Sequence, residues 1–137
     1  MSPLVVLDNE AVQALKGPAH RKHRRVVSHV QVVASRKRRA VAIDVVVPTA
    51  VRVEAGWDRT SSVWAFPNRL RIADIPLDAA HASTAAAIRS RTGVSVPDAH
   101  LGAVIQSAAA SHITVVTSDP DDMRVMAGDK AITVAAI

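Results

Sequence analysis

Four acidic residues lie at positions where a parallel sheet is expected to form its ligand-binding site. Asp8 and Asp119 each follow an apolar run of β-type residues, Asp98 opens a helical pattern, and Glu54 lies about two turns into the helix expected after another such run. Ligand sites in open parallel sheets form beyond the carboxyl ends of the strands. Carboxylates brought together there repel one another, and a hard divalent cation is the usual remedy. The four acids therefore predict a Mg²⁺ site with open positions for water and a phosphate.

Each acid taken singly also has a structural explanation. Aspartate is a preferred N-cap residue, so Asp98 or Asp119 alone is equally well explained as a helix cap. Glu54 alone is typical of a solvated helix position. Only the joint placement of all four favours the metal site.

Several other kinds of site are excluded by composition. The chain has no cysteine, so zinc fingers and thiol nucleophiles are ruled out. Its five glycines are isolated, which leaves neither a dinucleotide fingerprint nor a phosphate-cradling loop, and no Gly-x-Ser-x-Gly elbow is present. Aromatic residues make up 2% of the chain, too few for a base-stacking platform. Trp57 and Trp64 are better explained by core packing than by a partner contact.

The elements that must position the acids follow from the hydrophobic pattern. Short apolar runs typical of buried strands lie at residues 4–7, 41–47, 70–75, 113–117 and 131–135. Helical patterns lie between them, at residues 10–15, 20–37, after Pro48 as the first helical residue, from Asp78 to about Gly93, from Pro97 onward and at 120–127. Strands separated by helices predict a parallel sheet with helices on both faces.

Positive charge is concentrated in one segment. The 137-residue chain carries 17 Lys and Arg against 12 Asp and Glu, a formal net charge of +5. Eight of the 17 cations fall between Arg21 and Arg39. Such a segment favours a polyanionic partner such as nucleic acid. The alternative is a solvated helix whose charges only confer solubility.

Four short motifs, in this order and spacing, resemble a known family. They are Leu-Val-Val-Leu-Asp8-Asn9-Glu10, Val-Pro-Thr-Ala-Val-Arg-Val-Glu54, Val-Pro-Asp98-Ala-His-Leu-Gly-Ala-Val-Ile and Val-Val-Thr117-Ser-Asp119-Pro-Asp-Asp122-Met. Over essentially the whole chain, this pattern resembles the PIN domain, and specifically the VapC-type toxins of prokaryotic toxin–antitoxin pairs. Asn9 departs from the hydroxyl residue common after the first acid, and Met123 from the aromatic common after Asp122. Neither departure removes a candidate ligand.

The resemblance implies an α/β, PIN-like three-layer fold, with a central parallel sheet of four to five strands flanked by helices in a single domain spanning residues 1–137. It implies an endoribonuclease that depends on Mg²⁺ or Mn²⁺ and hydrolyses RNA phosphodiester bonds. The residues it assigns to catalysis and metal binding are Asp8, Glu54, Asp98 and Asp119, with Asp122 as an auxiliary ligand. Which of Asp119, Asp121 and Asp122 faces the metal stays open.

The partners implied by the resemblance are an RNA substrate, a cognate VapB-like antitoxin and a second copy in a homodimer. The expected location is the prokaryotic cytoplasm, and no apolar run approaches the length of a membrane span. The residues expected to contact RNA are Arg21, Lys22, Arg24, Arg25, Arg36, Lys37, Arg38 and Arg39. Two other classes remain open: a non-catalytic nucleic-acid-binding protein on this fold, and a metal-dependent DNA nuclease or phosphatase.

Overall fold

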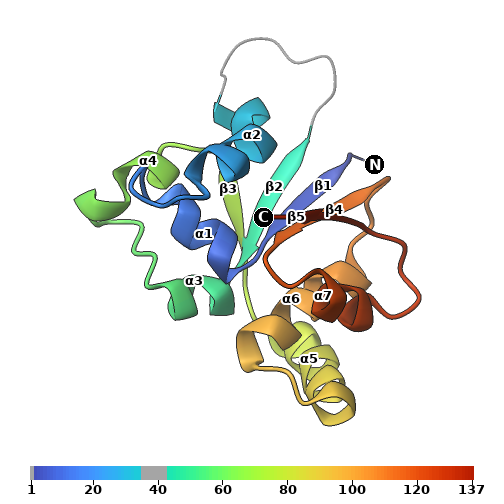
Figure 1. Ribbon diagram of the computed structural model, residues 1–137. Helices are drawn as coiled ribbons and strands as arrows, with labels where there is room; N and C mark the ends of the chain where they lie inside the picture. Colours follow the sequence, from blue (N-terminus) through green and yellow to red (C-terminus); the bar gives the residue numbers. More distant parts are fainter. Residues whose placement is uncertain (1, 35–42) are drawn as a thin grey trace.

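A computed structural model describes residues 2–34 and 43–137 (Figure 1). Its strands are β1 (Leu4–Leu7), β2 (Asp44–Pro48), β3 (Ile72–Ile75), β4 (Ile113–Thr117) and β5 (Thr133–Ala136). Its α-helices are α1 (Asn9–Leu15), α2 (His23–Ala34), α3 (Thr49–Ala55), α4 (Ala65–Asn68), α5 (Ala79–Thr92), α6 (Val96–Ser107) and α7 (Pro120–Ala127), with a 3₁₀ turn at Ser62–Trp64. The predicted alternation of strands and helices is confirmed. No helix in the described ranges is long and apolar enough to cross a membrane.

The strands form one parallel sheet in the order β3-β2-β1-β4-β5. In the centre, Val6 of β1 is opposite Val46 of β2, and Leu7 is opposite Val116 of β4. The chain adds β2 and β3 on one side of β1, then crosses back to add β4 and β5 on the other. Because crossovers are right-handed, this reversal sends the connecting helices to opposite faces. Figure 1 shows α1 to α4 on one side of the sheet and α5 to α7 on the other.

Burial on both faces of the sheet explains the continuous apolar run of β1, where Val6 and Leu7 have no exposed surface. Helix α6 is similarly enclosed, since α3, α5, α7 and β2 all pack around it. Gly102 permits this close packing. A Cβ added there would lie 2.9 Å from the Cδ1 of Ile88 and 3.1 Å from the Cβ of Met126.

The bounds of several predicted elements shift by a few residues, and β2 and β5 span Asp44–Pro48 and Thr133–Ala136 in place of 41–47 and 131–135. Helix α2 begins at His23 rather than His20 because residues 17–23 form consecutive turns, in which the His20 N–H donates to Gly17 and the His23 N–H donates to His20. The predicted end of this helix, Lys37, lies outside the described residues. Strand β3 begins two residues later than predicted, at Ile72.

Pro48 is not the first residue of a helix, so that prediction is wrong. It is the last residue of β2, opposite Ile75 of β3, and its extended backbone makes it the N-cap residue of α3. The two tryptophans are packing residues, as predicted. Trp57 and Trp64 are buried and stack with their ring centroids 6.0 Å apart.

Candidate active site

Asp8 and Asp119 lie where the sheet reverses its direction of growth. They follow β1 and β4, which are adjacent parallel strands whose next helices turn to opposite faces. Switch points of this kind, where the strand order reverses, are where open α/β sheets bind their ligands. The strand order thus brings together two acids that are 111 positions apart in the sequence.

The Asp8 carboxylate is tied to both sides of this switch point. Its Oδ1 accepts the Ala11 N–H at 2.9 Å, which caps α1, and its Oδ2 accepts the Ser118 N–H at 3.1 Å. The Thr117 hydroxyl also donates to this carboxylate. The residue is only 5% exposed. Asp8 is therefore held in one orientation by α1 and by the segment after β4.

Thr117 links the two acids that follow the central strands. Its Oγ1 accepts the Asp119 N–H at 2.8 Å, and its hydroxyl donates to Asp8. The side chain is fully buried. The sequence alone assigns this residue no role. The available signal was a hydroxyl at the buried end of an otherwise apolar strand, two residues before a candidate acid.

Burial raises the pKa of the Asp8 carboxyl above its ordinary value of 3.8. Hydrogen bonds from Thr117, Ala11 and Ser118 act in the opposite direction, and the nearby charge of Glu10 adds to the rise. Desolvation outweighs the three hydrogen bonds, so the ionised form of Asp8 is disfavoured in the protein without a bound cation.

Glu54 and Asp98 approach the same place from α3 and α6, two helices that pack together. Desolvation raises the pKa of Glu54, and the negative charges of Asp98 and Asp8 raise it further. Desolvation also raises the pKa of Asp98, against a hydrogen bond from Ser95, and the charges of Asp8, Asp122 and Asp119 add to that rise. Asp98 therefore interacts electrostatically with each of the other four predicted ligands, and Glu54 interacts with Asp98 and Asp8.

Asp98 is not the N-cap of α6, so the cap explanation does not apply to it. Ser95 is the N-cap residue, and its Oγ accepts the Asp98 N–H at 3.3 Å. Asp119 occupies the N-cap position of α7, yet its side chain accepts no capping hydrogen bond. Among the candidate acids only Asp8 caps a helix, and it does so with one of its two oxygens.

The three acids around the start of α7 face different surroundings. The Asp121 carboxylate pairs with Arg124 at 3.3 Å on the exposed surface. Asp119 and Asp122 instead act on Asp98 and raise its pKa. Asp119 and Asp122 are therefore the members of this group that belong to the acid cluster, whereas Asp121 belongs to the solvated surface.

The donor set fits Mg²⁺ or Mn²⁺ in its chemistry. It consists of carboxylate oxygens, the ligands that these hard cations prefer. The like charges that raise the pKa values of Glu54 and Asp98 are what a bound cation would offset. In the described part of the chain, no three Asp, Glu or His side chains are arranged to hold one ion as they stand. The acids are neighbours, and ligation requires their side chains to draw closer.

Half of the predicted RNA-binding residues can be placed. Arg21, Arg24 and Arg25 are exposed and Lys22 is half-buried, in the turn before α2 and its first residues. The other four lie outside the described residues: Arg36, Lys37, Arg38 and Arg39.

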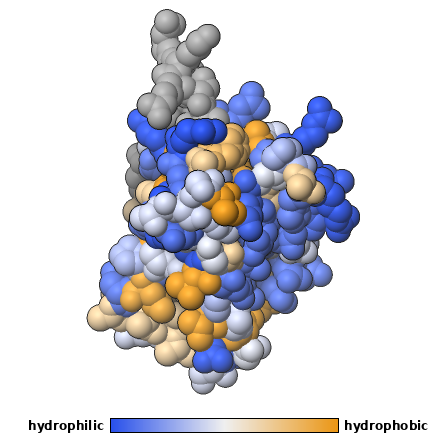
Figure 2. Space-filling model, turned by 90° about the vertical axis from the view of Figure 1, so that its left-hand side faces the viewer, coloured by the Kyte–Doolittle hydropathy of each residue, from blue (hydrophilic) through white to orange (hydrophobic). Residues whose placement is uncertain are grey.

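An apolar pocket that the sequence analysis did not identify adjoins Glu54. Its volume is about 400 Å³, and its lining is Thr49, Ala50, Val53, Glu54, Leu77, Val96 and Pro97. Val53 is 81% exposed, an unusual state for a large apolar side chain. Figure 2 shows hydrophobic side chains gathered on the lower half of the face that it presents.

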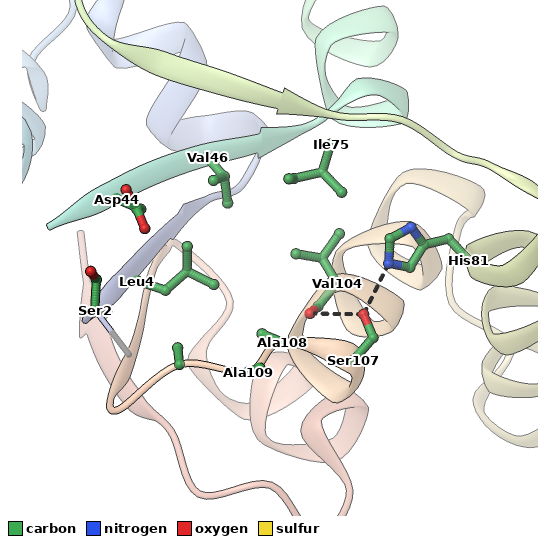
Figure 3. A pocket seen from close by; sticks show the side chains of 11 residues that line it. Ser2, Leu4, Asp44, Val46, Ile75, His81, Val104, Ser107, Ala108 and Ala109 are labelled. Carbon is green, nitrogen blue, oxygen red and sulfur yellow. Dashed lines mark hydrogen bonds between the residues drawn. The ribbon is translucent and has the colours of Figure 1, made fainter.

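A second cavity lies at the opposite end of the strands. Its volume is about 240 Å³, and it is lined by Leu4 and Asp44, the first residues of β1 and β2 (Figure 3). On its wall the His81 ring and the Ser107 hydroxyl are hydrogen-bonded at 2.9 Å. None of the predicted site residues lines this cavity, so it is separate from the acid cluster.

Comparison with known proteins identifies the fold. No family model and no curated protein sequence matches the chain. FitAcB from Neisseria gonorrhoeae is similar in structure, with a TM-score of 0.54, 16% sequence identity and coverage of 95% of each chain. VapBC2 from Rickettsia felis, bound to a DNA fragment from their promoter, has a TM-score of 0.56, 12% identity and coverage of 96% of each chain. The predicted PIN-like α/β fold, with a parallel sheet flanked by helices, is thereby confirmed.

Proposed function

We propose that the chain is a Mg²⁺-dependent endoribonuclease and the toxin of a VapBC-type toxin–antitoxin pair. The observation that carries the proposal is the convergence of Asp8, Glu54 and Asp98, from three different elements, at the switch point of the sheet. The structural similarity to VapBC2, over 96% of each chain, supports the toxin role. VapBC2 carries the name of the toxin–antitoxin pairs whose VapC toxins this sequence resembles.

Asp8, Glu54, Asp98 and Asp119 are the residues that would hold the ion, with Asp122 as the auxiliary member. When bound, Mg²⁺ or Mn²⁺ supplies a water of lowered pKa and neutralises charge on the scissile phosphate. The carboxylates' own contribution is to orient that centre, and they differ in how firmly they are held.

Asp8 is the fixed member of the set. A carboxylate offers about four lone-pair sites, and hydrogen bonds from Ala11, Ser118 and Thr117 use three of them. The remaining site is available to a cation in a position determined by β1 and β4. Glu54 is exposed on α3 and is the adjustable member, able to approach the ion by side-chain rotation.

The cations at residues 21–25 would attract RNA to a site whose own acids repel it. Phosphate contacts of this kind position a nucleic acid without reading its bases. Specificity for a particular RNA would therefore depend on its shape or on groups beyond this segment.

The proposed function includes two protein partners, a second copy of the chain and an antitoxin. A second copy would cover the apolar pocket lined by Val53, Leu77 and Val96, because one apolar patch meeting its own copy is the simplest symmetric contact. A cognate VapB-like antitoxin would hold the enzyme inactive. Dimerisation and antitoxin binding would both take place in the prokaryotic cytoplasm.

The test is cleavage of one sequence supplied as single-stranded RNA and as single-stranded DNA. The purified parent should cut the RNA with Mg²⁺ and stop in EDTA, and Asp8→Asn should be inactive. Cleavage of the DNA alone would make the chain a DNA nuclease. RNA binding without cleavage, unchanged in Asp8→Asn, would make it a non-catalytic binding protein. Toxicity on overexpression, relieved by a co-expressed antitoxin, tests the toxin role.

A further inference from the structure

Two histidines fasten the segment between α1 and α2 along the length of α1. The His20 Nε2 lies 2.8 Å from the Glu10 Oε1, in the first turn of the helix. The His23 Nδ1 lies 2.7 Å from the Ala14 carbonyl, in its last turn. The segment therefore runs alongside α1 and is attached near both ends of that helix.

The hydrogen bonds of His20 determine which of its nitrogens carries the proton. Its Nδ1 accepts the Lys22 N–H at 3.1 Å, so the ring proton is on Nε2 and is donated to Glu10. The neutral ring thus joins two parts of the chain. One nitrogen fixes the backbone at Lys22, and the other anchors that backbone to the start of α1.

The anchor point is next to the candidate active site. Glu10 is two residues after Asp8, and its charge acts on the Asp8 carboxyl. The anchored segment carries the exposed side chain of Arg21 and the half-buried side chain of Lys22, and the exposed Arg24 and Arg25 follow in the first turn of α2. An RNA phosphate approaching the acids meets net negative charge, and cations compensate for it only if they are held close by.

We propose that His20 is a positioning residue for the RNA substrate. By bridging Glu10 and the Lys22 backbone, it holds the side chains of Arg21 and Lys22 on the Glu10 side of the acid cluster, so that phosphates bound on them lead the strand to Asp8. This inference rests on the proposed function. It assigns the route of the substrate to the α1 side of the site.

Three substitutions separate positioning from general stability. His20→Leu removes both hydrogen bonds, whereas His20→Gln keeps an amide N–H that reaches Glu10. His112→Leu is the matched control, because the His112 Nε2 makes a comparable 2.8 Å hydrogen bond to the Thr133 hydroxyl at the far end of the sheet. All three variants are melted first, so that binding is compared below their unfolding temperatures.

Binding is measured with a fluorescent single-stranded RNA over a series of salt concentrations, in the Asp8→Asn background so that no RNA is cut. Each lost phosphate contact lowers the slope of log K against log salt by about 0.7 and weakens binding about fivefold at 0.1 M salt. We expect at least one contact to be lost in His20→Leu, a smaller loss in His20→Gln and none in His112→Leu. With Asp8 restored, His20→Leu should raise KM for RNA by the same factor and leave kcat unchanged.

An unchanged slope and KM in His20→Leu would overturn the inference, even if its melting temperature falls. So would an equal loss in His112→Leu, which would show a general effect of stability. The proposed function fails separately. If the parent binds RNA but does not cut it, the catalytic proposal is wrong while the salt slopes still decide the role of His20. If the parent binds no RNA, both are wrong.

Discussion

Asp8 serves as a helix cap and as the most firmly oriented acid of the candidate site. The two roles are compatible because the cap uses one lone pair of Oδ1, while Oδ2 is directed to the Ser118 N–H. Its sequence position, directly after an apolar run, was enough to place it among the candidate ligands. The contribution of Thr117 was not predictable, because a threonine at a strand end is common and only the adjacency of β1 and β4 brings its hydroxyl to Asp8.

Asp98 shows where residue type alone misleads. Aspartate is a residue type preferred at the N-cap of a helix, yet Ser95 is the N-cap of α6. The Asp98 carboxylate instead lies near other acids. The raised pKa of Asp98 has a consequence for stability. The contribution of Asp98 to the free energy of unfolding is fully present below its ordinary pKa of 3.8. It is lost as the pH rises through the raised pKa that Asp98 has in the folded protein.

Asp98→Asn should therefore stabilise the metal-free protein at neutral pH. Removing one like charge should gain about 1 kcal/mol, which corresponds to a rise in melting temperature of roughly 4 °C for a chain of this size. The gain should shrink as the pH falls toward and below 3.8, because Asp98 then becomes protonated in the unfolded state as well as in the folded one. The measurement is a set of melting curves in EDTA from pH 3.5 to 7.5. Asp121→Asn is the control and should melt with the parent throughout, since Asp121 pairs with Arg124 on the surface. A parent at least as stable as Asp98→Asn at pH 7 would refute the clustering of the acids.

At the scale of elements, the short buried strands and the Asp78-capped helix α5 were predictable because their signals are local. A continuous apolar run marks a strand covered on both faces, and a cap residue marks a helix start. The segment 17–22 was harder to predict, because its basic residues continue the polar face of α2 backward past the true start of that helix at His23. The turns begun by Gly17 and Pro18 override that pattern.

The first turn of α6 positions Asp98, so a change in that turn should affect both the stability of the helix and the activity of the site. Ser95→Ala removes the N-cap hydrogen bond and the hydrogen bond that lowers the Asp98 pKa. We expect a loss of about 1 kcal/mol of stability together with reduced RNA cleavage in Mg²⁺. Ser61→Ala is the matched control: it removes an equivalent cap, on the Val63 N–H, from the 3₁₀ turn before α4. It should cost similar stability and leave cleavage intact. Equal effects of the two variants on cleavage would mean that the cap does not act through Asp98.

At the scale of the whole molecule, the parallel sheet was predictable and the strand order was not. Alternating strands and helices allow several orders, and the choice among them depends on long-range packing. The order β3-β2-β1-β4-β5 puts the switch point between the strands that precede Asp8 and Asp119. The apolar pocket beside Glu54 depends on the same packing, since Val53, Leu77 and Val96 come from segments far apart in sequence.

The proposed homodimer gives the prediction at this scale. Val53→Asp places a charge in the centre of the apolar patch and should convert the dimer to a monomer, because a buried unpaired charge costs several kcal/mol. Val63→Asp is the matched control, since Val63 is 59% exposed and does not line this pocket. Sedimentation equilibrium measures both masses. If the parent is a monomer, or if the Val53→Asp variant remains a dimer, the proposal that a second copy binds to this surface is wrong.

The central claim is that the clustered acids, and not acidity in general, perform metal-dependent RNA cleavage. Asp98 and Asp121 allow a direct comparison, because both lie in the first turn of a helix but only Asp98 is in electrostatic contact with Asp8. The measurement is the initial rate of single-stranded RNA cleavage in Mg²⁺ by the parent, Asp98→Asn and Asp121→Asn. We predict parent activity for Asp121→Asn and a loss of more than about 100-fold for Asp98→Asn, since a lost ligand costs more than the 10–100-fold typical of a lost outer-shell partner. Parent-level cleavage by Asp98→Asn, or cleavage by the parent that persists in EDTA, would contradict the account.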